Sequence, residues 1–257
     1  MTTVDLNCDM GESFGAYHIG ADAEVMPFIT SANVACGFHG GDPGVMRETV
    51  ALAKQHGVAV GAHPGLPDLV GFGRRTMDVS AAEVYDAVVY QIGALAGTAA
   101  AQGVRLQHVK AHGALYHMGA ASREIAQAIA RAVRDVDRGL VFFALPASHL
   151  VTEAEAAGLK VANEAFADRN YTPEGTLVSR KRADAHVGKT EDVGQRAIRM
   201  VRDGRVRAVD GKDIAIRADT ICIHGDGPHA ADFARQLRSA FERDAIGVRA
   251  MGRATTA

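Results

Sequence analysis

Seven short apolar runs alternate with helical patterns along the chain, and this alternation limits the possible folds more than any other feature. The runs are rich in β-branched residues and bounded by glycine or polar residues, and they cover 3–8, 31–38, 58–63, 106–111, 140–145, 160–165 and 220–224. Strand–helix units without a hairpin signal predict parallel strands joined by right-handed crossovers. We therefore expect an α/β protein.

Amphipathic helices are predicted between these runs. Apolar residues recur every three or four positions in segments near 84–95, 125–133, 193–201 and 233–241. The predicted helix caps and stops agree with this spacing; they are Asp42 before Pro43, Ser80, Ser122 and Thr190 at the starts and Gly57, Gly103 and Gly158 at the ends.

Polar side chains follow nearly every predicted strand, which favours a closed barrel over an open sheet with its single switch point. The 257 residues fit one barrel of about 250 residues. We expect a single (β/α) barrel domain over 1–257, with a frayed tail from about residue 247. The polar stretch 166–189 is long for a connection and is predicted to be a functional loop or lid.

Composition excludes several classes of function. A net charge of −2 gives no electrostatic case for nucleic-acid binding. The sequence has no apolar run of roughly 18 residues and no basic segment followed by an apolar core, so we expect neither a membrane span nor a signal peptide. Cys8, Cys36 and Cys222 lie far apart. We expect reduced thiols in a cytoplasmic protein.

The ends of the first three runs carry the first candidate site residues. Asp9 is interpreted as a general base or metal ligand, with Asn7 positioning a substrate amide or carboxylate; the alternative is that either residue only caps a turn. His39 and His63 end the next two runs. Glycines around His39, together with the helix entered at Pro43, favour an oxyanion or anion site formed by backbone N–H groups.

Later strand ends supply the remaining candidates. Lys110 and His112 are two apart, so on one strand they would share a face as oxyanion stabiliser and proton donor, or as a structural salt-bridged pair. A second carboxylate and an arginine clamp lie at or just after the end of the sixth run, although a surface ion pair is the alternative. These residues are Glu164, Asp168 and Arg169, and His224 and Asp226 close the ring after the last run.

Two cofactor questions arise from the same residues. Asp9, His39, His63 and His224 could ligate a metal, but no short ligand spacing supports this, and the question stays open. Residues 183–190 fit a relaxed phosphate-loop pattern. That motif requires a buried strand before it, and the preceding segment 179–182 is polar, so we expect no nucleotide loop there.

Several segments together resemble the LamB/YcsF family, which includes the A component of bacterial ATP-dependent 5-oxoprolinase. They are DLNCDMGESFG at 5–15, SANVACGFH at 31–39, GAHPG at 61–65, GFGRR at 71–75, HGALY at 112–116, EAFADR at 164–169 and HGD at 224–226. The resemblance covers nearly the whole chain. It departs from the family at Ala111, where proline is usual, and at His117, where asparagine is usual.

The resemblance implies a distorted seven-stranded barrel of the glycoside hydrolase/deacetylase-like type. It also implies opening of the 5-oxoproline lactam to glutamate, with ATP and magnesium as co-substrate of a complex that contains B and C subunits. In this interpretation the catalytic residues are Asp9, His39, His63, Lys110 and His224, and the substrate-binding residues are Asn7, Glu12, Asn33, Gly37, His112, Glu164, Asp168, Arg169 and Asp226.

Two other functions remain as alternatives. One is a metal-dependent deacetylase or deaminase on the same type of barrel, although the absence of tryptophan and 5% aromatic residues argue against a polysaccharide groove. The other is a non-catalytic scaffold subunit. A scaffold gains nothing from titratable residues at the strand ends, so the sequence favours an enzyme.

Overall fold

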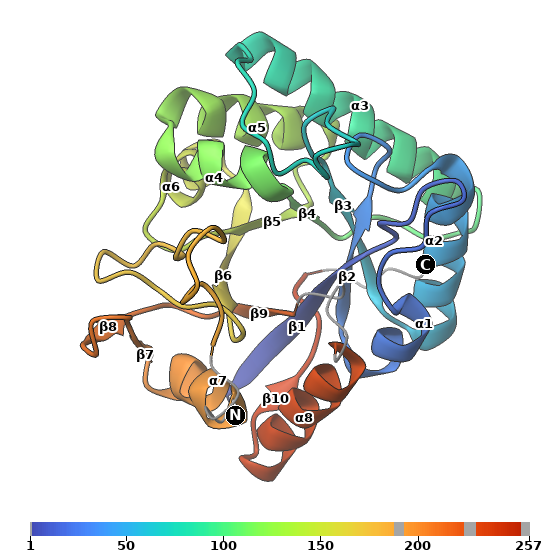
Figure 1. Cartoon of the computed structure of the whole chain (residues 1–257). Coiled ribbons are helices and arrows are strands. Elements are labelled where there is room, and N and C mark those ends of the chain that lie inside the picture. The colour runs from blue at the N-terminus through green and yellow to red at the C-terminus, as the bar shows by residue number, and fades with distance from the viewer. Residues whose placement is uncertain (1, 188–192, 224–229, 253–257) are drawn as a thin grey trace.

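Seven parallel strands close into a barrel in the computed structural model, which describes residues 2–187, 193–223 and 230–252. The strands are β1 (Thr3–Met10), β2 (Ser31–Ala35), β3 (Ala59–His63), β4 (His108–Lys110), β5 (Val141–Ala144), β6 (Lys160–Phe166) and β9 (Thr220–Ile223). Each of these strands pairs with the next in this order, and β9 pairs with β1, which closes the barrel (Figure 1). The predicted parallel barrel and all seven of its strands are confirmed.

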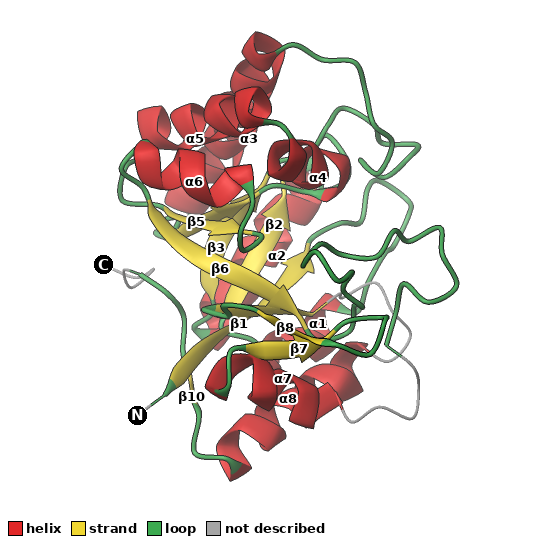
Figure 2. Cartoon of the chain, turned by 90° about the vertical axis from the view of Figure 1, so that its left-hand side faces the viewer, coloured by secondary structure: helices red, strands yellow, loops and turns green. Residues whose placement is uncertain are grey.

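Helices surround the strands, and long loops gather on one side of the molecule (Figure 2). The helices are α1 (Asp22–Val25), α2 (Pro43–His56), α3 (Ala81–Ala100), α4 (Gly113–Ala121), α5 (Arg123–Val136), α6 (His149–Ala156), α7 (Val193–Arg202) and α8 (Ala230–Arg243), with a 3-10 turn, η1, at Met26–Phe28. Asp42 accepts hydrogen bonds from the Gly44 and Val45 N–H groups, and Ser80 forms a capping box with Glu83. The predicted caps of α2 and α3 are confirmed.

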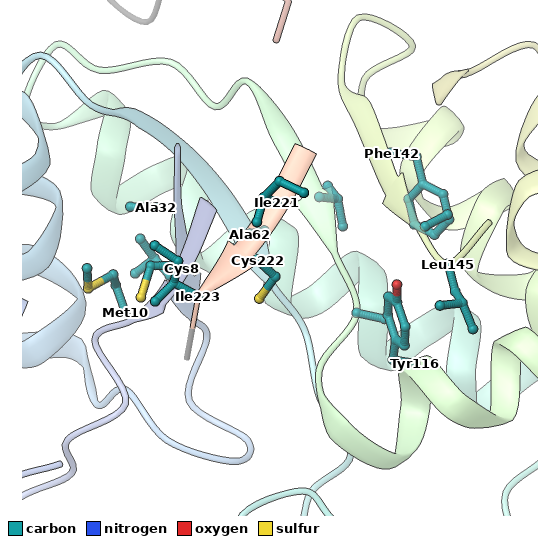
Figure 3. Close-up of a cluster of buried hydrophobic side chains, with 14 of the residues drawn as sticks. Cys8, Met10, Ala32, Ala62, Tyr116, Phe142, Leu145, Ile221, Cys222 and Ile223 are labelled. Carbon is teal, nitrogen blue, oxygen red and sulfur yellow. The ribbon is translucent and has the colours of Figure 1, made fainter. Parts of the chain in front are cut away.

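The outward-facing strand residues form an apolar core beneath the helices. On β1 they are Leu6, Cys8 and Met10, all fully buried. Figure 3 shows Cys8 and Met10 close to Ile223, whose strand β9 pairs with β1 at Cys8. All three cysteines are buried and unpaired, as expected.

The barrel interior is polar, because the alternate residues of β1 are Asp5, Asn7 and Asp9. Barrel interiors of this general type are usually filled by branched apolar side chains. Here hydrogen bonds satisfy the buried groups instead: the Asp5 carboxylate accepts from the hydroxyls of Ser31 and Thr220, at 2.7 and 2.6 Å. Such a network tolerates little change in shape.

Gly61 on β3 makes room for the buried imidazole of His108 inside the barrel. A Cβ atom at Gly61 would overlap the His108 ring. Gly61→Ala should therefore lower the free energy of unfolding by about 1–3 kcal/mol through overpacking. Chemical denaturation is the measurement. Gly93→Ala is the matched control, since no atom lies within 4 Å of a Cβ there.

The control variant should be stabilised by about 1 kcal/mol, because Gly93 lies inside α3 and alanine is the better helix former. A Gly61→Ala protein as stable as the unmodified chain would show that His108 can vacate the interior, and the proposed packing constraint would be wrong.

Two predictions about the chain's organisation are wrong. The tail is not frayed from residue 247, because β10 (Gly247–Val248) pairs with Thr3 and Val4 at the start of β1. The later residues of β1 pair with β2 and β9. An antiparallel hairpin also exists, formed by β7 (Arg205–Arg207) and β8 (Asp213–Ala215). Its strands are charged and mostly exposed, so they lack the apolar pattern that reveals a strand.

Within the described ranges, no helix combines the length and apolar character needed to cross a membrane.

Candidate active site

Asp9 and Lys110 form an ion pair at the carboxyl end of the barrel. Lys110 Nζ lies 2.8 Å from Asp9 Oδ1 and 2.9 Å from Glu164 Oε1, so one buried ammonium joins two carboxylates from different strands. Burial alone would lower the pKa of Lys110, but the two carboxylates outweigh it and hold this pKa well above its usual value. Lys110 is therefore a fixed positive charge rather than a proton donor at neutral pH.

Buried amides orient the Asp9 carboxylate. Asn33 Nδ2 donates to Asp9 Oδ1 at 2.9 Å and to Asn7 Oδ1 at 2.8 Å. Asn33 Oδ1 in turn lies 2.8 Å from His108 Nε2. Burial, followed by the Lys110 charge, lowers the pKa of His108 to about 3, so this ring is neutral and donates its Nε2 proton to Asn33.

Three histidines gather around Glu12 next to this pair. Glu12 Oε1 lies 3.2 Å from His39 Nε2 and 3.4 Å from His112 Nδ1. The His39 and His112 rings are stacked with centroids 3.6 Å apart, and His63 Nε2 lies 3.0 Å from His112 Nδ1. His63 Nε2 also lies 3.3 Å from Asp9 Oδ2, which links the two groups.

The cluster of Glu12, His39, His63 and His112 could hold a metal ion, since one ligand atom from each lies within 4.8 Å of the others. This set differs from the one considered in the sequence. Glu12 and His112 join His39 and His63, while Asp9 pairs with Lys110, and His224 lies outside the described residues. His112 was placed on a strand with Lys110, but β4 ends at Lys110, and His112 precedes the first turn of α4.

A cavity of about 450 Å³ opens onto both groups. Its lining residues include Asp9, His63, Arg74, Lys110, His112, Tyr116, His117, Phe166, Arg169, Val178, Arg180 and Lys181. The Asp9 side chain is 12% exposed, against 4% for Lys110 and 0% for Glu164. Asp9 is therefore the carboxylate of this group that a bound molecule can reach, within a mainly cationic wall.

The loop after β6 forms one wall of the cavity, through residues 177–181. Arg169 holds this loop, since its guanidinium donates to the carbonyls of Val178 at 2.6 Å and Ala185 at 3.2 Å. Burial, then the neighbouring Arg180, lowers the pKa of Arg169 to about 10. Arg169 also lines the cavity, and its role as a substrate clamp stays a prediction.

Several backbone N–H groups near His39, which were expected to bind an anion, form hydrogen bonds within the protein. The Gly37 N–H donates to the Gly40 carbonyl at 2.8 Å, and the Gly41 N–H donates to the Ser13 carbonyl at 2.9 Å. The first N–H groups of α2 donate to the Asp42 carboxylate. These donors are used within the protein itself. Gly37 therefore shapes the turn before His39, with a positive φ of 95°.

The remaining predicted residues fall into two groups. Asp168 lies half-buried beyond the end of β6 and outside the set of cavity-lining residues. His224, Asp226 and the part of the phosphate-loop pattern from 188 to 190 lie outside the described residues. Among the described residues, 179–182, which come directly before that pattern, form no strand.

Sequence reasoning missed His108, Tyr116 and Arg74 as neighbours of the site. His108 and Lys110 are two apart on one strand, so their shared orientation was available from the spacing. Tyr116 lies in the HGALY segment, one helical turn after His112, and burial together with Glu164 raises its pKa well above the usual value. No sequence signal singled out Arg74.

A closed parallel barrel that brings carboxylates, histidines and a lysine to one mouth has the layout of a barrel enzyme. The sequence profile of the LamB/YcsF family matches residues 4–256, and the chain belongs to this family. The A component of 5-oxoprolinase from Bacillus licheniformis is 57% identical over 250 residues, covering 97% of this chain and 99% of that protein. The protein of the same name from Bacillus subtilis is 53% identical over 251 residues, covering 98% of each.

Solved structures agree with the fold. The crystal structure of a lactam utilization protein from Thermus thermophilus is 52% identical, with a TM-score of 0.92 over 97% of this chain and 100% of that one. The catalytic domain of a peptidoglycan N-acetylglucosamine deacetylase from Eubacterium rectale is 11% identical, with a TM-score of 0.52 over 99% and 91%. This second likeness concerns the barrel fold alone.

Proposed function

We propose that this chain is the A component of an ATP-dependent 5-oxoprolinase, which opens the lactam of 5-oxoproline to glutamate. High identity over nearly the full length of relatives with that name supports the assignment. Within the site, the observation that supports this assignment is the ion pair between Asp9 and Lys110 on a cationic cavity wall. Such a wall suits a small substrate that carries a carboxylate.

The reaction needs a nucleophile and stabilisation of an oxyanion. A lactam is a stable amide with a poor leaving group, and phosphorylation of its oxygen by ATP would supply the driving force. Asp9 would then take a proton from the water that adds to the carbon bearing the phosphorylated oxygen, while the fixed charge of Lys110 stabilises the negative charge on the tetrahedral intermediate. Cleavage of the C–N bond of this intermediate would leave an acyl phosphate, which a second water would convert to glutamate and phosphate. Breaking the C–N bond requires a proton on nitrogen, and the histidine group beside Asp9 is positioned to assist this step or to polarise the carbonyl.

The B and C partner subunits would complete the enzyme and supply the nucleotide site. The motivation is that the chain's phosphate-loop pattern lacks a preceding strand. The isolated chain, given 5-oxoproline, ATP and magnesium, should release almost no glutamate. With the B and C partners added, it should release glutamate and consume ATP together. A glutamate-release assay with parallel measurement of ADP is the test.

The two possible failures are distinct. ATP-dependent glutamate release by the isolated chain would contradict the division of labour between the components. The absence of glutamate release from the complete mixture, when the equivalent chain of a relative restores it, would contradict the assignment of the activity itself.

A further inference from the structure

We infer that Glu12, His39, His63 and His112 form a binding site for one divalent transition-metal ion of the Zn²⁺ type. Three imidazole nitrogens and one carboxylate oxygen are the donor set that such ions favour. The inference does not rest on the proposed 5-oxoprolinase activity. It rests on the orientation of the rings, the spacing of the donor atoms and their position at the cavity wall.

Backbone carbonyls determine the tautomers of two of the histidines. His63 Nδ1 lies 2.8 Å from the Lys110 carbonyl oxygen, and His112 Nε2 lies 2.8 Å from the Phe72 carbonyl oxygen. A carbonyl only accepts hydrogen bonds, so each of these nitrogens carries the proton. The other nitrogen of each ring then presents a lone pair toward the cluster. Metal-bound histidines are typically held by such a contact on their second nitrogen.

The two lone pairs face each other, since His63 Nε2 and His112 Nδ1 are 3.0 Å apart. Two acceptors at this distance repel unless a cation lies between or beside them. A metal ion satisfies both lone pairs and the nearby carboxylate at once.

The spacing of the donor atoms suits a metal ion. Bonds of about 2.0–2.1 Å in tetrahedral geometry place neighbouring ligand atoms roughly 3.3 Å apart. The observed separations are 3.2 Å from Glu12 to His39, 3.4 Å from Glu12 to His112 and 3.0 Å from His63 to His112. All four donors lie within 4.8 Å of one another, so small side-chain shifts would complete the coordination.

The site is closed on one side and open on the other. All four ligands are buried, but His63 and His112 also line the cavity, whereas Glu12 and His39 do not. Asp9 Oδ2, 3.3 Å from His63 Nε2, lies at this open side. With four protein ligands in place, an oxygen of a bound molecule would enter from the cavity as a fifth ligand, an expansion that catalytic zinc sites undergo. The ion would lie where a carbonyl or water oxygen of a bound molecule could reach it.

The test uses the full-length chain without an affinity tag, stripped with a chelator, dialysed against excess Zn²⁺ or Co²⁺ and separated from unbound metal. We expect about one ion per chain by elemental analysis, and visible absorption from the Co²⁺ form. Glu12→Gln and His112→Asn should each weaken metal binding at least tenfold. This is a lower bound, because losing a residue that only hydrogen-bonds a metal ligand already costs roughly 10–100-fold in affinity. His117→Asn is the matched control and should bind like the unmodified chain, because His117 lines the same cavity but lies outside the cluster.

Circular dichroism checks that each variant is folded, and the near-isosteric Glu12→Gln decides the matter if His112→Asn unfolds. Uptake of less than about a tenth of an ion per chain at excess of both metals would overturn the inference. Equal binding by folded Glu12→Gln and the unmodified chain would also overturn it, since the ion would then lie elsewhere. Either result leaves the proposed lactam chemistry untouched, because no step of this test measures turnover.

Discussion

Replacing Asp9 by asparagine should lower kcat of the complete, partner-containing enzyme by about 10²–10⁴-fold, the usual contribution of a positioned general base. Asparagine keeps the volume of the side chain and an oxygen that can accept from Asn33 and Lys110. It loses the charge that would take a proton from water. Glutamate release under saturating 5-oxoproline and ATP is the measurement, with a thermal melt of each protein beside it.

Asp86→Asn is the control for this change, because Asp86 is exposed on α3 and is not among the residues that line the cavity. It should leave both turnover and melting temperature as they are. A folded Asp9→Asn enzyme with more than about a tenth of normal turnover would rule out Asp9 as the base, since general-base catalysis is worth at least 10²-fold.

The barrel could be predicted because strand and helix signals were strong and agreed along the chain. Each strand was a short apolar run with a clear stop, and the caps of α2 and α3 stood where the helical period began. β7, β8 and β10 could not be predicted in this way. The hairpin strands are charged, and β10 is a strand of only two residues that pairs with the first residues of β1.

The site could be predicted as a set of residues but not as a set of contacts. A parallel barrel brings all strand ends to one mouth, so the convergence of Asp9, His39, His63 and Lys110 followed from the topology. Which histidine faces which carboxylate depends on ring orientation. That orientation is determined by the Lys110 and Phe72 carbonyls, which leave no trace in the residue pattern.

The expected anion site near His39 shows a further limit of sequence reasoning. Glycines and a helix start near His39 were compatible with exposed N–H groups, but the same glycines also allow tight turns that use those groups internally. The structure shows the second outcome, with Gly41 donating to Ser13 and Asp42 capping α2. Composition alone cannot distinguish the two, because both require the same backbone freedom.

Replacing Lys110 by methionine should abolish turnover and also destabilise the fold, by about 3–5 kcal/mol. The variant removes the charge that would stabilise the oxyanion, and it leaves the carboxylates of Asp9 and Glu164 close together without a cation between them. Chemical denaturation measures the stability loss and glutamate release the activity. Lys160→Met is the control, because Lys160 is exposed at the start of β6 and should change stability by no more than about 0.5 kcal/mol.

A double variant, Lys110→Met with Glu164→Gln, separates the two effects of this lysine. Neutralising Glu164 removes one of the two neighbouring carboxylate charges, so part of the lost stability should return. Turnover should stay absent, because the positive charge next to Asp9 is still missing. Recovery of activity together with stability would mean that Lys110 serves only to hold the barrel interior together, and the oxyanion role would have to pass to other groups around the cavity.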